Sequence, residues 1–173
     1  MALLALACAE SPAPRPDAVG APPTFAAGIG GGGSALPAAA TCVGAGLSPA
    51  VWWSGLPEDT ADLLLVLRSS AGALHWAAWS LRPADGGLPA GIPSTQAPPL
   101  QGRNAGGVIG WLPPCSPPAA PDERLQGLVY ALSEPLLAPP TAELDALLER
   151  AAPLTIGVAR FELRAFDEGL PHE

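Results

Sequence analysis

Few side chains in this chain are suited to catalysis or to metal binding. The 173 residues include two histidines and three cysteines, and one histidine, His172, stands in the last residues of the chain. His75 is therefore the one plausible general base, and no serine or cysteine is placed to act with it as a nucleophile. No two cysteines have the close spacing of zinc ligands. We expect neither an enzyme nor a bound metal or other cofactor.

His75 has two interpretations when only the residues are considered. An imidazole donates a hydrogen bond to an anion and gains a positive charge in its cationic form, so His75 is a candidate anion ligand. A histidine within a strand can equally be satisfied by a neighbouring backbone group.

Segments dense in proline, glycine and tryptophan lie before and after His75. One runs from Ser48 to Pro57 and contains Trp52-Trp53, and the other runs from Gly110 to Pro118. Proline fixes φ and glycine permits conformations that other residues avoid, so both segments are predicted to be shaped loops. Such loops often carry binding sites.

The predicted elements are mostly strands. Four apolar or alternating stretches predict them, at residues 63–67, 74–81, 125–132 and 155–166. One helix is predicted late in the chain, with Thr141 as its cap, Glu143 in its first turn and Pro153 as its end. The fold class is mainly β with one helix near the C-terminus.

Composition limits the partners. The formal net charge is −8, and all eight basic residues are arginines without a run among them, which argues against nucleic-acid binding. No apolar segment is long enough to span a bilayer. A small molecule or a protein partner is therefore expected, and the oligomeric state is left open.

The first 35 residues predict export. Residues 1–8 are apolar and end at Cys8, like a truncated lipoprotein signal whose cysteine would carry lipid; the alternative is a frayed apolar tail. Residues 9–35 are rich in proline and glycine and predict a flexible linker between a lipid anchor and the domain, or alternatively an ordinary disordered N-terminus. A domain is expected at 36–166 and an acidic tail at 167–173. Removal of residues 1 to about 33 should then leave the stability unchanged.

Four segments, in this order, resemble the phosphatidylethanolamine-binding protein family, in particular its bacterial Raf-kinase-inhibitor-like branch. The matching residues are Leu36-Pro37, Thr41-Cys42-Val43-Gly44, Ser48-Pro49, Val51, Trp53, Gly55, Pro57, His75-Trp76, Gly102-Arg103-Asn104, Gly107, Gly110-Trp111, Pro114-Cys115, Pro117, Arg124 and Tyr130-Ala131-Leu132. The resemblance covers roughly residues 36–164. It implies two packed β-sheets, a larger and a smaller, with the helix near the C-terminus.

The resemblance also implies a pocket for a phosphate or similar anion. The residues that it assigns to this site are His75, Arg68, Trp111, Pro114, Cys115, Glu123, Arg124 and Pro49. It places Trp53 and Trp111 at the mouth of the pocket, with core packing as the alternative for both.

Two positions depart from the family pattern. Arg68 stands where the family has an aspartate, and Glu123 stands where it has a histidine. Arg68 could bind an anion with its planar guanidinium. Alternatively, Arg68 and Glu123 could form an ion pair that fills the pocket, so that the family ligand is lost.

The resemblance brings Cys42 and Cys115 to the same rim. In an exported protein they would form a disulfide and leave Cys8 for lipid, whereas in a cytoplasmic protein both would be thiols. The function expected first is non-catalytic binding of a small, phosphate-bearing anion by an exported, periplasmic or lipid-anchored protein. The alternative is a protein-interaction module such as a kinase or protease inhibitor.

Overall fold

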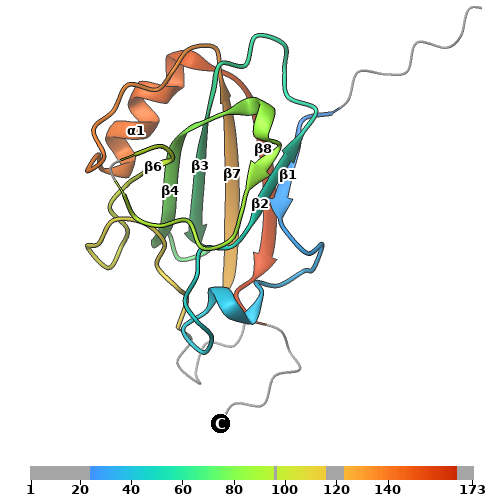
Figure 1. Ribbon diagram of the computed structural model, residues 1–173, viewed down its shortest axis with the longest axis vertical. Coiled ribbons are helices and arrows are strands. Elements are labelled where there is room, and N and C mark those ends of the chain that lie inside the picture. The colour runs from blue at the N-terminus through green and yellow to red at the C-terminus, as the bar shows by residue number, and fades with distance from the viewer. Residues whose placement is uncertain (1–23, 96, 116–122, 167–173) are drawn as a thin grey trace, which may run out of the picture.

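The computed structural model describes residues 24–95, 97–115 and 123–166, which form two β-sheets and a short helix (Figure 1). The smaller sheet has the strand order β1-β2-β5 and the larger has the order β6-β4-β3-β7-β8. The strands are β1 (Ala26–Ile29), β2 (Val51–Ser54), β3 (Asp62–Ser69), β4 (Leu74–Leu81), β5 (Gly87–Leu88), β6 (Leu100–Gln101), β7 (Arg124–Leu132) and β8 (Thr155–Arg164). The helices are α1 (Leu144–Ala151) and the 3₁₀ turns Ala38–Ala40, Pro83–Asp85 and Ala152–Leu154. The predicted fold class is confirmed.

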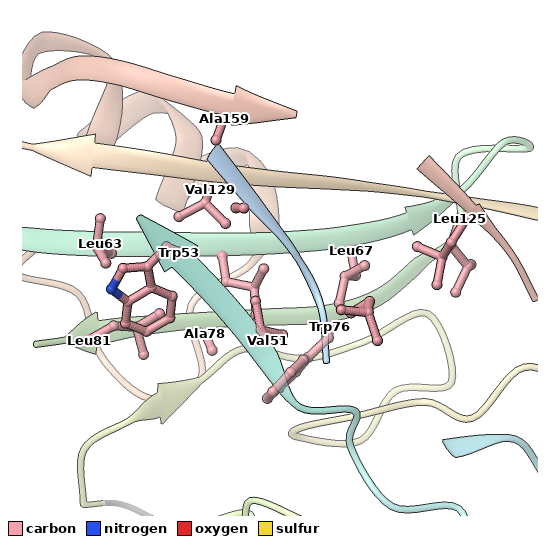
Figure 2. Close-up of a cluster of buried hydrophobic side chains, with 14 of the residues drawn as sticks. Val51, Trp53, Leu63, Leu67, Trp76, Ala78, Leu81, Leu125, Val129 and Ala159 are labelled. Carbon is pink, nitrogen blue, oxygen red and sulfur yellow. The ribbon is translucent and has the colours of Figure 1, made fainter. Parts of the chain in front are cut away.

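β3 is buried on both faces because it lies in the middle of the larger sheet. Leu63, Leu65 and Leu67 face the core between the two sheets, while Leu64 and Val66 face the core under α1. Figure 2 shows Trp53 of the smaller sheet beside Leu63 and Leu81, with Leu67 and Trp76 farther along the same core. Trp53 is therefore a core residue, and its Nε1 donates to the carbonyl of Pro83.

The helix begins later than the sequence predicted. α1 starts at Leu144, and the residue at its N-cap is Glu143, which makes no side-chain capping bond. Thr141 lies in the preceding turn and is not the cap. The helix is held by its apolar face, where Leu147 and Ala151 are buried against the larger sheet. It is too short to span a bilayer, as are the other described helices.

The folded domain begins earlier than residue 36. β1 pairs along its whole length with β2, in the register Ala26–Ser54 to Ile29–Val51, and buries Ala27 and Ile29 in the core. Phe25 packs against the same core. The predicted linker at 9–35 is thus wrong for residues 26–29, because a four-residue strand was hidden among glycines. Residues 1–23, with Cys8, and the tail at 167–173 lie outside the described residues.

A buried carboxylate at the start of β3 joins three segments, and no pattern in the sequence indicates this role. Asp62 accepts hydrogen bonds from the backbone N–H groups of Leu63, Leu81 and Leu136, at 2.7, 2.9 and 2.9 Å. Burial raises the pKa of the Asp62 carboxyl, and the bonds from Leu136, Leu63 and Leu81 oppose that rise.

Truncation at Ser34 should destabilise the protein. The loss of β1 removes Ile29 from the core, which alone is worth about 2–5 kcal/mol, or a fall of roughly 5–20 °C in the thermal midpoint. Calorimetry measures the thermal midpoint of a protein that starts at Ser34. A protein that starts at Thr24 and keeps β1 is the control. Equal midpoints for the two proteins would contradict the described sheet.

Asp62→Asn should lower the free energy of unfolding by about 1–3 kcal/mol, because an amide NH₂ would meet the N–H of Leu136. The exposed Asp59, which has φ +66°, supplies the control Asp59→Asn.

Because the folded pKa of Asp62 is raised, wild type should gain stability relative to Asp62→Asn as the pH falls through that pKa. Denaturant curves at several pH values measure the free energy of unfolding. If wild type and Asp62→Asn show the same free energy of unfolding at every pH, the role of the Asp62 carboxylate is refuted.

Candidate functional site

His75 is the extra residue of a β-bulge in β4. Leu67 of β3 pairs with Trp76, whereas the next residue, Arg68, pairs with Leu74, so His75 has no partner of its own in the ladder. A bulge re-aims a side chain and occurs often beside binding sites. Here His75 and Trp76 are adjacent in sequence, yet the rings of both lie close to Trp111, with centroids 5.9 and 6.1 Å away.

The imidazole of His75 is held in one orientation by the loop after Gly110. Its Nδ1 lies 2.8 Å from the carbonyl oxygen of Leu112, and the N–H of Leu112 donates to the carbonyl of His75 at 2.8 Å. Nδ1 must therefore carry the hydrogen, which leaves Nε2 to interact with the site. His75 is 5% exposed, so this atom lies almost out of bulk water.

A carboxylate occupies the space beside that nitrogen. Oε1 of Glu123 lies 3.7 Å from Nε2 of His75, and the Glu123 side chain is 26% exposed. The separation exceeds that of a direct hydrogen bond, about 2.7–3.2 Å. The carboxylate is thus placed to compensate an imidazolium without being locked to it.

Arg68 and Arg124 do not join this site. Side chains alternate along a strand, and Leu67 and Leu125, their neighbours in sequence, face the core between the sheets. Arg68 pairs with Gln126 in the ladder, on the opposite face. Among the described residues there is no ion pair between Arg68 and Glu123, and Arg68 lies on the other face of the sheet from the core between the sheets. Arg124 is exposed on that same opposite face.

Trp111 forms a wall of the site but does not offer its indole N–H to a ligand. Its Nε1 donates to the carbonyl of Ala40 at 3.0 Å, which ties this loop to the segment before Cys42. Gly110, which precedes it, has φ +102°, and a side chain there would collide with Ser94. Glycine is therefore required at the turn that delivers Trp111.

Two buried amides support the aromatic residues, and the sequence analysis assigned neither a role. Gln101 is fully buried, accepts from Nε1 of Trp76 at 2.8 Å and donates to the carbonyl of Pro93 at 2.8 Å. Asn104 donates to the carbonyl of Gly110 and accepts from the N–H groups of Gly106 and Val108. The glycines around Asn104 indicated a turn, but only the fold shows what the turn holds.

Cys42 and Cys115 meet at the rim of the site. Their Cα atoms are 5.3 Å apart and their sulfurs are paired, and the N–H of Cys42 donates to the carbonyl of Pro114 at 3.2 Å. Pro114 is buried beside this junction, and Pro49 is buried in the segment that leads into β2. Both prolines shape backbone. Pro117 lies outside the described residues.

In its cationic form the ring of His75 carries a hydrogen on both nitrogens, and Nε2 can then donate to a negatively charged oxygen. The ring has one nitrogen fixed by a carbonyl and the other directed at an acidic oxygen, with an aromatic wall formed by Trp111. Within the described ranges, His, Cys, Asp and Glu side chains form no group of three or more that could hold a metal ion.

The chain belongs to the phosphatidylethanolamine-binding protein family, since the sequence profile of that family matches residues 31–164. A UPF0098 protein of Methanothermobacter thermautotrophicus is 29% identical over 132 residues, 72% of this chain and 86% of that protein. A UPF0098 protein of Archaeoglobus fulgidus is 31% identical over 108 residues, 58% of this chain. The matched segment spans only 37% of the latter protein's length.

Two solved structures have the same fold. A putative phosphatidylethanolamine-binding protein homolog from Chlamydia trachomatis has a TM-score of 0.73 at 24% identity, covering 83% of this chain and 98% of that one. YbcL of E. coli, described as a new member of the mammalian family, has a TM-score of 0.71 at 21% identity, covering 83% and 99%. These similarities confirm the two-sheet fold.

Oxidation of Cys42 and Cys115 should stabilise the protein. A cross-link between residues 73 positions apart contributes roughly 3–5 kcal/mol in the chain-entropy model. Peptide mapping without reductant should recover the two cysteines in one linked species, and Cys42→Ser/Cys115→Ser should unfold at a lower temperature. Complete alkylation of both thiols in protein from an oxidising compartment would show that the bond is absent.

Proposed function

We propose that this chain is a non-catalytic binding protein that receives the anionic group of a small, phosphate-bearing molecule at Nε2 of His75. The observation that carries the proposal is the position of Glu123. Its carboxylate stands 3.7 Å from Nε2, where the negatively charged oxygen of a ligand would sit. A protein that places an acidic oxygen there has a site whose charge and geometry suit an anion.

Glu123 would then act as an internal competitor of the ligand. Its side chain is partly exposed and its oxygen is beyond direct hydrogen-bond distance from the ring, so it can leave without breaking a short bond. The backbone of Glu123 stays fixed, because its carbonyl accepts from the N–H of Ala165 at 2.8 Å. Ligand entry therefore needs a rotation of one side chain.

The contacts of the ring favour binding over catalysis. Nδ1 faces a backbone carbonyl and Nε2 faces a carboxylate, so neither nitrogen is directed at a hydroxyl or a thiol in the described parts of the chain. A disulfide at the rim supports an exported protein, because such bonds persist in oxidising compartments.

Titration calorimetry with phosphoethanolamine and with inorganic phosphate tests the proposal. Wild type should bind weakly, near millimolar, about −4 kcal/mol, and His75→Ala should abolish the heat. Glu123→Gln should bind more tightly, because two like charges about 4 Å apart repel by about 1–4 kcal/mol. Glu134→Gln, at an exposed position, removes the same charge elsewhere and should leave the affinity unchanged.

The alternative is a protein-interaction module, and two exposed apolar side chains favour it. Val43 is 82% exposed and Leu47 is 45% exposed, in the loop that the Cys42–Cys115 pair ties to the rim. If neither phosphate nor phosphoethanolamine gives heat with Glu123→Gln, the anion site is refuted and this loop becomes the better candidate.

A further inference from the structure

The outer end of the larger sheet gathers positive charge on a protein whose net charge is −8. Seven arginines lie in the described residues, and four of them belong to adjoining positions of β3, β7 and β8. These four, which we call the arginine face, are Arg68, Arg124, Arg160 and Arg164.

The strand registers show how these four residues are arranged on the sheet. Gln126 of β7 pairs with Arg68 of β3 on one side and with Glu162 of β8 on the other. Arg124 precedes Gln126 by two residues on the same face, and Arg160 pairs with Leu128, two residues after it. With strands about 4.8 Å apart and alternate residues about 6.6 Å apart, the Cα atoms of Arg68 and Arg124 are roughly 8 Å from each other.

This face is distinct from the His75 site. Leu125, Val129 and Ala131 of β7 face the core between the two sheets. Arg124 and Gln126 alternate with these residues along the strand, so their side chains lie on the opposite face. A hollow of about 310 Å³ lies on this part of the molecule and is lined by Gln126, Gly127, Leu128, Arg160, Phe161 and Glu162.

Three of these positive charges are not neutralised within the described structure. Among the residues that it covers, Arg68, Arg124 and Arg160 form no ion pair. Arg164 is engaged, because its Nη2 donates to Oγ of Ser34 at 3.3 Å. Arg124 and Arg164 are also direct partners across the ladder, and like charges in that position destabilise a sheet.

We propose that the arginine face is a second binding site, which takes a molecule carrying two or more phosphate groups. A planar guanidinium binds a phosphate through two parallel hydrogen bonds. The guanidinium groups of Arg68, Arg124 and Arg160 come from three neighbouring strands and together offer more positive charge than a single phosphate carries, so a molecule with two or more phosphates matches them better. Gln126 at the centre supplies an uncharged amide donor.

The same chemistry could come from a soluble polyphosphate or from a polyphosphorylated lipid headgroup. Calorimetry with tripolyphosphate measures the first source. Flotation with phosphatidylcholine vesicles, with and without a phosphatidylinositol bisphosphate, measures the second. Binding in either assay supports the site when the arginine variants described next weaken it, and binding in neither assay overturns the proposal.

Variants of single charges locate the binding. Arg68→Gln, Arg124→Gln and Arg160→Gln should each weaken it by about tenfold, the loss of one charge-assisted hydrogen bond. The control is Arg82→Gln, because Arg82 is exposed and pairs with Asp85 at 3.1 Å. An equal loss in Arg82→Gln would overturn the proposal, since it would show that only overall charge matters.

Glu162 supplies a test with the opposite sign. It is the acidic residue of the Arg68–Gln126–Glu162 row, so Glu162→Gln should strengthen binding several-fold, whereas Glu149→Gln on α1 should not. His75→Ala should leave tripolyphosphate binding intact, which separates this site from the one at His75. Loss of tripolyphosphate binding in His75→Ala with no effect of the three arginine variants would refute the arginine face and leave the His75 site standing.

Discussion

The β-bulge in β4 is the constraint on which the candidate site depends. A regular strand would send His75 and Trp76 to opposite faces of the larger sheet. With His75 as the unpaired residue between Leu74 and Trp76, both rings reach Trp111. The loop that carries Trp111 and Leu112 then fixes the imidazole through backbone atoms alone. The orientation of Nε2 is thus set by main-chain geometry.

Alternation along β3 and β7 separates two kinds of charge. Glu123 and Arg124 are neighbours in sequence, yet one meets His75 and the other is exposed on the far face of the sheet. Leu67 and Arg68 divide in the same way. Arg68 therefore lies on the face away from the core between the sheets, and Glu123 supplies the acidic group beside the histidine.

The sequence was sufficient for the fold class because the central strands are strongly apolar. Continuous apolar runs predict buried strands at Leu63 to Leu67 and at Leu74 to Leu81, and the structure has strands there. The order of the motifs identified the family. Short strands without such a pattern were missed. β1 is built of two alanines, a glycine and Ile29, so its stability comes from pairing with β2 and from contact with the core.

The partners of the site residues could not be predicted for a related reason. A one-residue bulge is not visible in composition or in periodicity, and it decides which face His75 occupies. Opposite charges at Arg68 and Glu123 suggest an ion pair when only the sequence is considered, but the alternation of side chains along the strands places the two residues on different faces of the sheet. The hydrogen bonds of Asp62, Gln101 and Asn104 join segments distant in sequence, so only the folded structure reveals them.

If the proposal is right, Nε2 of His75 contacts an anionic oxygen of the ligand at the place that the Glu123 carboxylate occupies in this structure. The most direct measurement is the ¹⁵N resonance of the His75 ring in Glu123→Gln as phosphoethanolamine is added, with His172, the other histidine of the chain, as an internal reference. We expect a saturable shift of the Nε2 resonance of His75 with no matching change at His172. An unchanged His75 resonance at saturating phosphoethanolamine would contradict it.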